Sequence, residues 1–406
     1  MPNINIIAVP FHDWKKSQTE GFRTRDVHLL QEFIRHPSVD RILIVDRPIS
    51  LIEMLLLRRR WHITGGECVY QHKYNRLTKI NDKTFVLDMY SAQLASPLIK
   101  RRRWIPAVYG DPATSQGVTE AIHYLNLDQY VLFLSSPLPI PLYRQLRRPT
   151  LIVDAVDNML KIPQFSKLQS EIASYYDEIR ENADVVFSNS IATVEFLKKG
   201  NRPTIYIPNG VDYRHFRVIE NQIPSDLQGF SQPIIGYAGK MQEIFDVDML
   251  RHAAMALPDV IFICIGQLLN PKWMRPLWQL PNVKYLGDKH YDLLPSYLAN
   301  FDICIIPYNL ERQHFNDPIK FYEYLAMNKP VVTTRIGGVS AFEHCQQVKI
   351  VNNAAEFINA LHYFLNLIRD GSKIPPVELP VDVLWSTKAN KMIDVITQIM
   401  VDDDKT

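Results

Sequence analysis

Short apolar runs alternate with longer segments of helical periodicity along the chain. The apolar runs predict buried strands, and the periodic segments between them predict helices. In the first half the predicted strands are Ile4–Pro10, Arg41–Val45, Val131–Leu134, Thr150–Val153, Val185–Asn189 and Thr204–Ile207. The predicted helices there are Phe22–Arg35, Gln116–Leu125 and Phe165–Asn182. This alternation is typical of βαβ units and predicts an α/β fold with a parallel sheet.

The same rhythm restarts after Pro233. The second set of predicted strands is Pro233–Ala238, Val260–Ile265, Val283–Leu286, Ile303–Pro307, Pro330–Thr334 and Lys349–Val351. The predicted helices are Asp246–Ala256, Leu293–Ala299 and Lys320–Met327. We therefore expect two doubly wound, Rossmann-like domains in tandem, with ligands outside the carboxyl ends of their strands.

Turn and linker residues predict where the domains meet. The join falls near Ile207–Arg217, where Pro208-Asn209-Gly210 supplies turn chemistry. Asp370–Pro380 is rich in proline and polar residues and predicts a linker before a last helix, Trp385–Met400. The aspartates at positions 402 to 404 predict a solvated and disordered tail.

Composition narrows the class of protein. The chain has 406 residues, 47% hydrophobic and 22% charged, as is ordinary for a globular protein. A net charge of +2 excludes a polyanion binder, so we expect no nucleic-acid partner. Four cysteines lie far apart, so no disulfide framework or zinc site is expected, and Cys264 and Cys304, which stand in apolar runs, are predicted to be buried thiols. With no leader or membrane-spanning run recognised, we expect a soluble, cytoplasmic protein.

The densest chemistry lies in Asp317–Val332. Pro318 is suited to open a helix, and Lys320 and Glu323 then share one face of it. A helix N-terminus with a nearby cation suits phosphate, and a carboxylate one turn later suits a ribose diol. The alternative is an ordinary surface Lys–Glu pair.

This stretch resembles the motif P-x-K-x-x-E-Y-L-A-x-x-K-P-V-V of retaining GT-B glycosyltransferases of the group-1/family-4 kind. The resemblance implies that Glu323 holds the ribose hydroxyls of a nucleotide sugar, and that Lys320 faces the diphosphate. The preceding loop, with Asn316, Asp317 and Ile319, would approach the donor sugar. Many members carry a glutamate where this chain has Phe315, which makes the sugar contacts of the loop less certain than the ribose contact.

Other segments match the same family in the same order. Ile207–Asp212 resembles its P-N-G-V-D signature, and Ile235–Lys240 its first donor-domain strand and glycine-rich loop. There Gly236 and Gly239 would let backbone approach a diphosphate, with Lys240 binding it. The second cation of this loop is missing, because Phe245 and Asp246 stand near its position. The resemblance further implies a floor at Gly266 and a nucleobase contact through His290 and Tyr291, whose alternative is a half-buried surface aromatic.

In the first half the candidates are fewer. Gly21 and Arg23, with Arg25, lie in the loop that in this family faces the phosphates and acceptor; a helix-start charge cluster is the alternative. Asp157 follows a strand, and we select it to position the acceptor or assist proton removal, although it could cap the next helix. His12 is the alternative catalytic group.

The family resemblance implies a GT-B enzyme whose domains face each other across a cleft. The domains are an acceptor domain (1–207), a donor domain (208–375) and a segment (376–406) whose helix crosses back to the first. We expect hexosyl transfer with retention from UDP-sugar, with glucose as first choice, to a hydroxyl acceptor in polysaccharide or glycolipid synthesis. Lys240 and Lys320 would replace a metal, so no metal or other cofactor is expected. Rival functions are an NDP-sugar epimerase, a phosphorylase and a non-catalytic nucleotide-sugar-binding partner.

Two basic runs remain outside this scheme. Arg58-Arg59-Arg60-Trp61 follows an apolar helix, and Lys100-Arg101-Arg102-Arg103-Trp104 follows Leu98-Ile99. Such runs suit the edge of an anionic membrane, which would place the protein peripherally at the inner face of the plasma membrane. The alternative is a pair of solvated helix ends beside core tryptophans.

Overall fold

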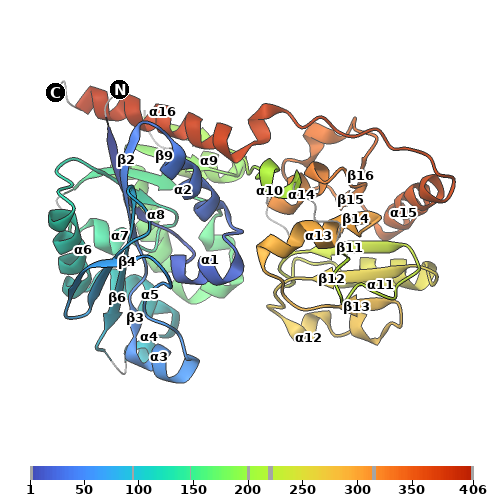
Figure 1. Cartoon of the computed structure of the whole chain (residues 1–406), viewed down its shortest axis with the longest axis horizontal. Helices are drawn as coiled ribbons and strands as arrows, with labels where there is room; N and C mark the ends of the chain where they lie inside the picture. Colours follow the sequence, from blue (N-terminus) through green and yellow to red (C-terminus); the bar gives the residue numbers. More distant parts are fainter. Residues whose placement is uncertain are drawn as a thin grey trace. The chain divides into compact units, whose positions relative to one another are not determined.

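The computed structural model describes residues 3–93, 96–146, 148–198, 202–217, 223–312 and 317–403. The chain forms two compact units (Figure 1). Unit 1 comprises Met1–Ile207 and Ser386–Thr406, and unit 2 comprises Pro208–Trp385. Each has its own sheet and its own core.

Unit 1 is built on a mixed sheet with the order β10-β9-β8-β7-β1-β2-β6-β5-β4, and β3 pairs with β6 at its side. The strands from β10 to β6 are parallel, whereas β5 and β4 are antiparallel. Their bounds are β1 Ile4–Val9, β2 Val39–Val45, β3 Ile49–Ser50, β4 Glu67–His72, β5 Asn75–Lys79, β6 Thr84–Ser91, β7 Val131–Leu134, β8 Thr150–Asp154, β9 Val185–Ser188 and β10 Thr204–Tyr206.

The antiparallel extension escapes the sequence prediction. Strand β4 lies at the sheet edge and has no buried residue. An edge strand with neither face buried needs no apolar run, so the signal by which strands were recognised is absent there. The buried parallel strands β1, β7, β8 and β9 match their predicted positions closely. The parallel strand β6 is mostly buried as well, but the sequence analysis missed it.

Helices cover the unit 1 sheet and complete its core. Their bounds are α1 Trp14–Glu20, α2 Arg25–Arg35, α3 Leu51–Leu57, α4 Ser96–Lys100, α5 Trp104–Tyr109, α6 Pro112–Tyr124, α7 Ile140–Tyr143, α8 Gln169–Asn182 and α9 Ile191–Leu197. Helix α8 shows why they pack: Ile172, Tyr176 and Ile179 recur at helical spacing, and all three are buried in the core.

The last helix, α16 (Trp385–Asp403), begins at the end of unit 2 and belongs to unit 1 from Ser386 onward. Ala389, Met392, Ile393 and Ile396 form its fully buried stripe at i, i+3, i+4 and i+7. We expected the helix to end at Met400 and the tail to be disordered. Instead the helix continues to Asp403.

Unit 2 contains a six-stranded, all-parallel sheet with the order β13-β12-β11-β14-β15-β16. Its strands are β11 Ile234–Ala238, β12 Ile261–Ile265, β13 Val283–Tyr285, β14 Ile303–Ile306, β15 Val331–Thr334 and β16 Val348–Val351. Its helices are α10 Tyr213–Arg217, α11 Val247–Ala256, α12 Pro271–Met274, α13 Leu294–Ala299, α14 Ile319–Ala326 and α15 Ala354–Arg369. Cys264 and Cys304 are buried free thiols in β12 and β14, which confirms that prediction.

The segment predicted as a linker, Asp370–Pro380, packs on unit 2. Ile374, Val377 and Leu379 are partly buried against its core, and the Val377 amide donates to Gln347 Oε1 over 3.0 Å. We expected residues 376–385 to belong with the returning helix. In the structure they lie with unit 2. Apolar residues among the prolines hold this segment in place.

No described helix has both the length and the apolar character needed to cross a bilayer.

Gly236 has a role in packing rather than in ligand approach. A Cβ atom at this position would lie 1.9 Å from Cδ2 of Phe301, whose ring is buried in the unit 2 core. Gly236 stands in the middle of β11, away from the loop that ends the strand. Our expectation that it lets backbone approach a diphosphate is therefore wrong, and the glycine makes room for an aromatic ring.

We predict that Gly236→Ala lowers the free energy of unfolding by on the order of 3 kcal/mol, because the added methyl group overpacks the core. The same substitution in a Phe301→Ala background, where the ring is gone, should cost less than about 1 kcal/mol. Urea denaturation of the four proteins measures the coupling. Equal costs in both backgrounds would contradict this role.

Candidate functional site

Three neighbouring strands of unit 2, β12, β11 and β14, end in loops that converge at the carboxyl edge of its sheet. Gly239 follows β11 with φ 153°, and Gly266 follows β12 with φ 127°. A Cβ atom on Gly266 would lie 2.1 Å from the Gly239 carbonyl oxygen, so the two turns pack backbone against backbone. Both positions require glycine, for conformation and for space.

Lys320 lies directly against this glycine turn. A Cβ atom on Gly239 would fall 2.4 Å from Lys320 Cε, and Lys320 Nζ donates a hydrogen bond of 2.6 Å to the Tyr308 hydroxyl. The ammonium also lies over the ring of Tyr237, 5.5 Å from its centroid. Tyr308 follows β14, so the strand end holds the lysine head beside the turn after β11.

Helix α14 directs a second source of positive potential to the same edge. Its N-cap is Pro318, which makes no side-chain capping hydrogen bond, and its first turn contains no acidic residue. The helix dipole therefore points its positive end at the loop, and Lys320 adds a full charge where a cation is normally unfavourable. This combination suits an anion such as a phosphate.

Glu323 lies one turn further along α14 and is buried, with 4% exposure. Its Oε1 accepts a 2.7 Å hydrogen bond from the Tyr291 hydroxyl. Burial, with the neighbouring Glu323 carboxylate, raises the pKa of Tyr291 well above its ordinary value, so the phenol remains a donor. The carboxylate is thus fixed in position, as a ligand for a diol requires.

Tyr291 is buried beside Glu323, so its ring is not exposed for stacking on a nucleobase. Its ring is buried and stacks on His215, with centroids 4.5 Å apart and planes 7° apart. His215 Nε2 also lies 3.1 Å from the Tyr291 carbonyl oxygen. We expected ring stacking on a base, whereas the structure uses the ring in packing and the hydroxyl to orient a carboxylate. His290, next to it, remains partly exposed beside Asp292.

Asp317 is also used internally. Its Oδ2 accepts from the Asn209 amide over 2.6 Å and its Oδ1 accepts from the Tyr322 hydroxyl over 2.8 Å, and the side chain is buried. Asp317 ties the Pro-Asn-Gly turn to the start of α14. We predicted that its carboxylate contacts a donor sugar, whereas in the structure it accepts these internal hydrogen bonds. Ile319, the first residue of α14, is half-buried, and Asn316 lies outside the described residues.

Lys240 is half-exposed at the end of the same glycine turn, where its carbonyl oxygen accepts a 2.8 Å hydrogen bond from Tyr237. Phe245 is fully buried, and Asp246 caps α11 by accepting from the Met249 amide over 2.9 Å. Neither residue compensates for the second cation that many family members carry there.

The predicted arginine candidates of unit 1 are paired. Arg25 is buried and makes a two-pronged ion pair with Asp154, with both N–O distances at 2.9 Å. This pair ties α2 to the end of β8, so Arg25 does not reach for a ligand as we suggested. Arg23 is half-exposed beside Glu20, 3.2 Å away.

Gly21 and His12 have local structural roles. Gly21 ends α1 in the left-handed region, with φ 85°. The His12 amide donates to Asp26 Oδ2 over 2.8 Å, and its ring lies 3.3 Å from that carboxylate. Burial would raise the pKa of Asp26, but His12 and the Thr24 hydroxyl together hold it well below its usual range.

Asp157 is half-buried and lies just past the end of β8. Its carbonyl oxygen accepts a 3.1 Å hydrogen bond from the Tyr176 hydroxyl. It is not the N-cap of the following short helix, because Asn158 has that position. The structure thus leaves Asp157 near the carboxyl edge of the unit 1 sheet, within a different unit from Lys320 and Glu323.

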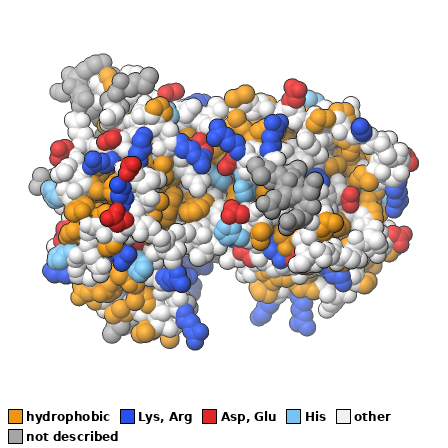
Figure 2. Space-filling view, in the orientation of Figure 1, with side chains coloured by type: hydrophobic (Ala, Val, Ile, Leu, Met, Phe, Trp, Pro, Cys, Tyr) orange, Lys and Arg blue, Asp and Glu red, His pale blue; other side chains and the backbone are white. Residues whose placement is uncertain are grey.

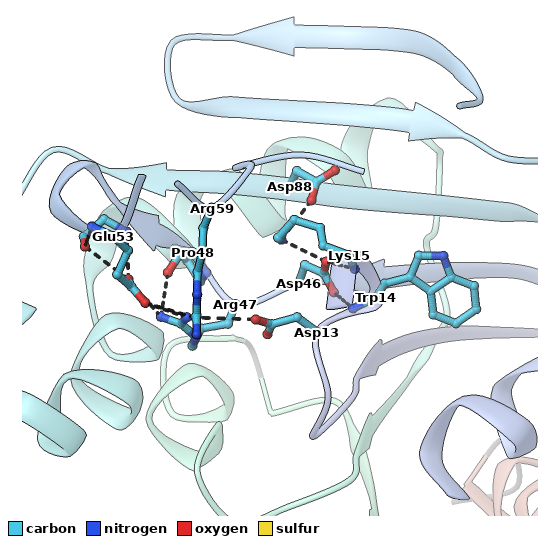
Figure 3. Close-up of polar contacts among 10 residues, drawn as sticks. Asp13, Trp14, Lys15, Asp46, Arg47, Pro48, Glu53, Arg59 and Asp88 are labelled. Carbon is cyan, nitrogen blue, oxygen red and sulfur yellow. Dashed lines mark hydrogen bonds and ion pairs between the residues drawn. The ribbon is translucent and has the colours of Figure 1, made fainter. Parts of the chain in front are cut away.

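A buried charge cluster at this edge was missed by the sequence analysis (Figure 3). Lys15 Nζ bridges Asp46 at 2.8 Å and Asp88 at 3.0 Å, and both carboxylates are fully buried. The Trp14 amide adds a 2.5 Å hydrogen bond to Asp46 Oδ1. Asp46 directly follows β2 and Asp88 interrupts the apolar β6, which are the signals that could have revealed them.

The ionisation of this cluster follows from burial and pairing. Burial raises the pKa of Asp46 to about 6, against the opposing effect of Lys15. Burial also raises the pKa of Asp88, while for Lys15 the two carboxylates outweigh burial and raise its pKa. The cluster joins the start of α1 to the ends of β2 and β6. A neighbouring ion pair, Arg47 with Glu53 at 2.9 Å, continues it.

Among the described residues, no group of three or more His, Cys, Asp or Glu side chains is arranged to hold a metal ion. Independence of metal remains a prediction for solution experiments.

The match to a known protein family lies within unit 2. Residues 232–366 match the family described as Glycosyl transferases group 1. The relative "Putative teichuronic acid biosynthesis glycosyltransferase TuaH" of Bacillus subtilis is 31% identical over 154 residues. That match covers 36% of this chain and 38% of the relative, so the chain spans well under half of the relative's length.

Solved structures match across both units. Sucrose-phosphate synthase from Thermosynechococcus elongatus superposes with a TM-score of 0.69 at 15% identity, covering 98% of this chain and 100% of that one. Anabaena HepE in complex with UDP-glucose gives 0.60 at 16% identity, with full coverage of both. A UDP-forming trehalose-phosphate synthase from Burkholderia xenovorans gives 0.63 at 10%, covering 98% and 100%. At these identities the likeness establishes the fold.

We predict that Lys15→Met lowers the free energy of unfolding by about 3 to 5 kcal/mol at pH 8, because two buried carboxylates lose their cation. The loss should be smaller at pH 5. Burial raises the pKa of Asp46 even with Lys15 present, and loss of the cation raises it further. At pH 5 the folded variant therefore holds a proton on Asp46, which relieves the unpaired charge.

Urea denaturation at both pH values measures this effect. Lys16→Met is the matched control, since Lys16 is exposed and its pair with Glu20 spans 3.5 Å. It should change the stability by less than about 0.5 kcal/mol at either pH. A Lys15 variant as stable as the control would show that the cluster is not essential to unit 1.

Proposed function

We propose that the chain transfers a hexosyl group from a UDP-sugar to a hydroxyl acceptor, because its fold is that of GT-B glycosyltransferases and its residues 232–366 match the family described as Glycosyl transferases group 1. We propose UDP-glucose as the donor, retention of the anomeric configuration and no requirement for a divalent ion. The product would belong to a polysaccharide or a glycolipid, made on the cytoplasmic side.

One observation carries the proposal. Lys320 lies against the Gly239 turn and in the first turn of an uncapped helix, while Glu323 is held by Tyr291 one turn further along. The backbone of the Gly239 turn, the Lys320 ammonium and the N-terminus of α14 suit a diphosphate. The oriented Glu323 carboxylate suits a vicinal diol. A nucleoside diphosphate sugar contains both groups at this kind of spacing.

The choice of donor and product rests on relatives. HepE is a fold neighbour whose structure holds UDP-glucose, and TuaH is named for teichuronic acid biosynthesis. HepE favours a UDP-sugar, and TuaH favours a polymeric product. Gly266 and the partly exposed His290 lie on the same side of unit 2 and would complete the nucleotide site, as the backbone beside Tyr291 would.

Unit 1 would bind the acceptor. Asp157, near the carboxyl edge of its sheet, remains our candidate for positioning the acceptor hydroxyl, with His12, Gly21 and Arg23 in the neighbouring loop. His12 remains the alternative catalytic group.

The chemistry needs no protein nucleophile. The acceptor oxygen forms a bond to the anomeric carbon on the face that the diphosphate leaves, and its proton passes to the departing phosphate oxygen. Lys320, Lys240 and the α14 N-terminus would stabilise the negative charge that develops on the diphosphate. The neutral phenols of Tyr237 and Tyr308 keep the Lys320 ammonium in place without neutralising it.

We predict that Glu323→Gln weakens UDP binding by about 10- to 100-fold, because an amide nitrogen cannot accept a ribose hydroxyl. Lys320→Gln should weaken it similarly and also slow UDP release from UDP-glucose. Isothermal titration calorimetry and a UDP-release assay measure these effects. The amide oxygen that Glu323→Gln introduces can still accept from Tyr291, so the fold should be retained.

Matched controls are Glu343→Gln and Lys272→Gln, both exposed positions in unit 2. They should bind UDP like wild type. Binding of UDP without transfer to any sugar acceptor would favour the non-catalytic partner, and UDP release with sugar isomerisation would favour the epimerase. A wild-type protein that fails to bind UDP would refute the site.

We predict that Tyr291→Phe weakens UDP binding by about fivefold, the loss expected for one hydrogen bond that orients the carboxylate. Tyr291→Leu should weaken it further, because His215 then loses its stacking partner. Were the ring instead a stacking surface for the base, phenylalanine would bind UDP as well as tyrosine does. The calorimetric affinities of the three proteins decide between these roles.

A further inference from the structure

Two short helices of unit 1 leave large apolar side chains in solvent. In α3, Leu55 is 76% exposed and Leu56 is 67% exposed; in α4, Leu98 is 58% exposed and Ile99 is 78% exposed. Isolated exposed leucines are common on protein surfaces, but four on two neighbouring helices are unusual and indicate an interaction site.

The sheet brings the two helices together. Strand β3 pairs with the end of β6 at Ile49–Tyr90 and Ser50–Ser91. Helix α3 begins directly after β3, and α4 begins at Ser96, a few residues after β6. Figure 1 places both helices at the same end of unit 1, and Figure 2 shows hydrophobic side chains gathered there with Lys and Arg side chains beside them.

Basic side chains surround these apolar ones. Arg58, Arg59 and Arg60 follow α3, and Lys100 and the arginines at 101 to 103 follow the apolar pair of α4; all are exposed. The single acidic residue of these segments, Glu53, already pairs with Arg47 at 2.9 Å.

Most of these cations are not neutralised within the protein. In the part of the chain that the structure describes, no ion pair involves Arg58, Arg60, Lys100 or Arg101. Arg59 lies 3.5 Å from Glu53, and Arg103 lies 2.9 Å from Glu171. The whole chain has a net charge of only +2, so this end of unit 1 holds a local excess of positive charge.

The tryptophans of the two runs do not belong to this surface. Trp104 is 3% exposed and lies in the unit 1 core, and Trp61 packs edge-on against Tyr90 with centroids 5.1 Å apart. They anchor the segments from inside. The leucines and isoleucine of α3 and α4, in contrast, remain mostly exposed.

We propose that this basic–apolar patch, made of Leu55, Leu56, Leu98 and Ile99 with the flanking Arg58–Arg60 and Lys100–Arg103, docks the protein on an anionic phospholipid surface. Apolar side chains enter the boundary of the acyl chains, while the flanking cations remain at the level of the negatively charged headgroups. Attraction of the cations and burial of the apolar groups act at the same place, and neither alone would be sufficient.

A second copy of the chain is the weaker candidate for this surface. In a symmetric dimer the same patch meets itself, so seven basic side chains of each copy would be brought together. Like charges in contact oppose association. A membrane with acidic headgroups complements both features of the patch: its negative headgroups attract the cations, and its acyl chains accept the apolar side chains.

The test is flotation of the full-length protein with vesicles of phosphatidylcholine alone or with about 30 mol% phosphatidylglycerol, an anionic lipid. The protein should bind the anionic vesicles and not the neutral ones. Binding should fall as salt is raised from about 0.1 M to about 0.5 M, because screening shortens the reach of the charges.

Two double variants separate the contributions. Arg58→Gln/Lys100→Gln should weaken binding by about 25-fold, at roughly fivefold for each cation. Leu56→Ser/Ile99→Ser should weaken it by about tenfold or more, since buried apolar area is lost. The matched control, Lys272→Gln/Arg275→Gln, removes two exposed cations of unit 2 and should stay within about twofold of wild type.

All four proteins should show the same thermal unfolding and UDP affinity, so that loss of vesicle binding is separable from loss of folding or of the nucleotide site. Failure of the wild type to float with anionic vesicles would overturn the proposal. So would patch variants that float like wild type, or a concentration-dependent dimer that the Leu56→Ser/Ile99→Ser variant abolishes.

Discussion

Close packing of two glycine turns is the constraint on which the unit 2 site depends. The carbonyl of Gly239 occupies the space in which any side chain at position 266 would lie, and the head of Lys320 fills the space beside Gly239. The strands β11 and β12 can therefore end side by side while backbone remains open at the sheet edge. A larger residue at position 239 would displace the lysine on which the proposed diphosphate contact rests, and one at position 266 would displace the backbone of the Gly239 turn.

The charged groups at the carboxyl edges of the two sheets are held in different ways. Unit 1 neutralises its buried charges internally: Lys15 lies between two aspartates, and Arg25 is matched to Asp154. Unit 2 holds the Lys320 ammonium with neutral phenols, so its charge is retained for a ligand. This difference argues for placing the nucleotide in unit 2. It also shows why arginines after β1 are weaker candidates than their position in the sequence suggested.

Several residues with ligand-binding appearance turn out to support their neighbours. Asp317 holds the Asn209 turn, and Tyr291 orients Glu323 from below. Asp317 lies next to the family motif, and Tyr291 lies in a separate segment that resembles the same family, which is why the sequence presented them as direct contacts. A buried polar group in a loop must satisfy its hydrogen bonds, and in this site those bonds make the supporting shell of the proposed ligand contacts.

The amino-acid pattern by itself was enough to identify two α/β units with largely parallel sheets, the border near Pro208 and the pair Lys320–Glu323 on one helix. These depend on local periodicity, turn chemistry and a contiguous motif, all of which are written along the chain. Only the tertiary structure revealed the Lys15 cluster, the Tyr291–Glu323 bond and the pairing of β3 with β6 that places α3 and α4 at one end of unit 1. These contacts join residues distant in sequence, and hydrophobic pattern carries no information on which buried polar groups meet.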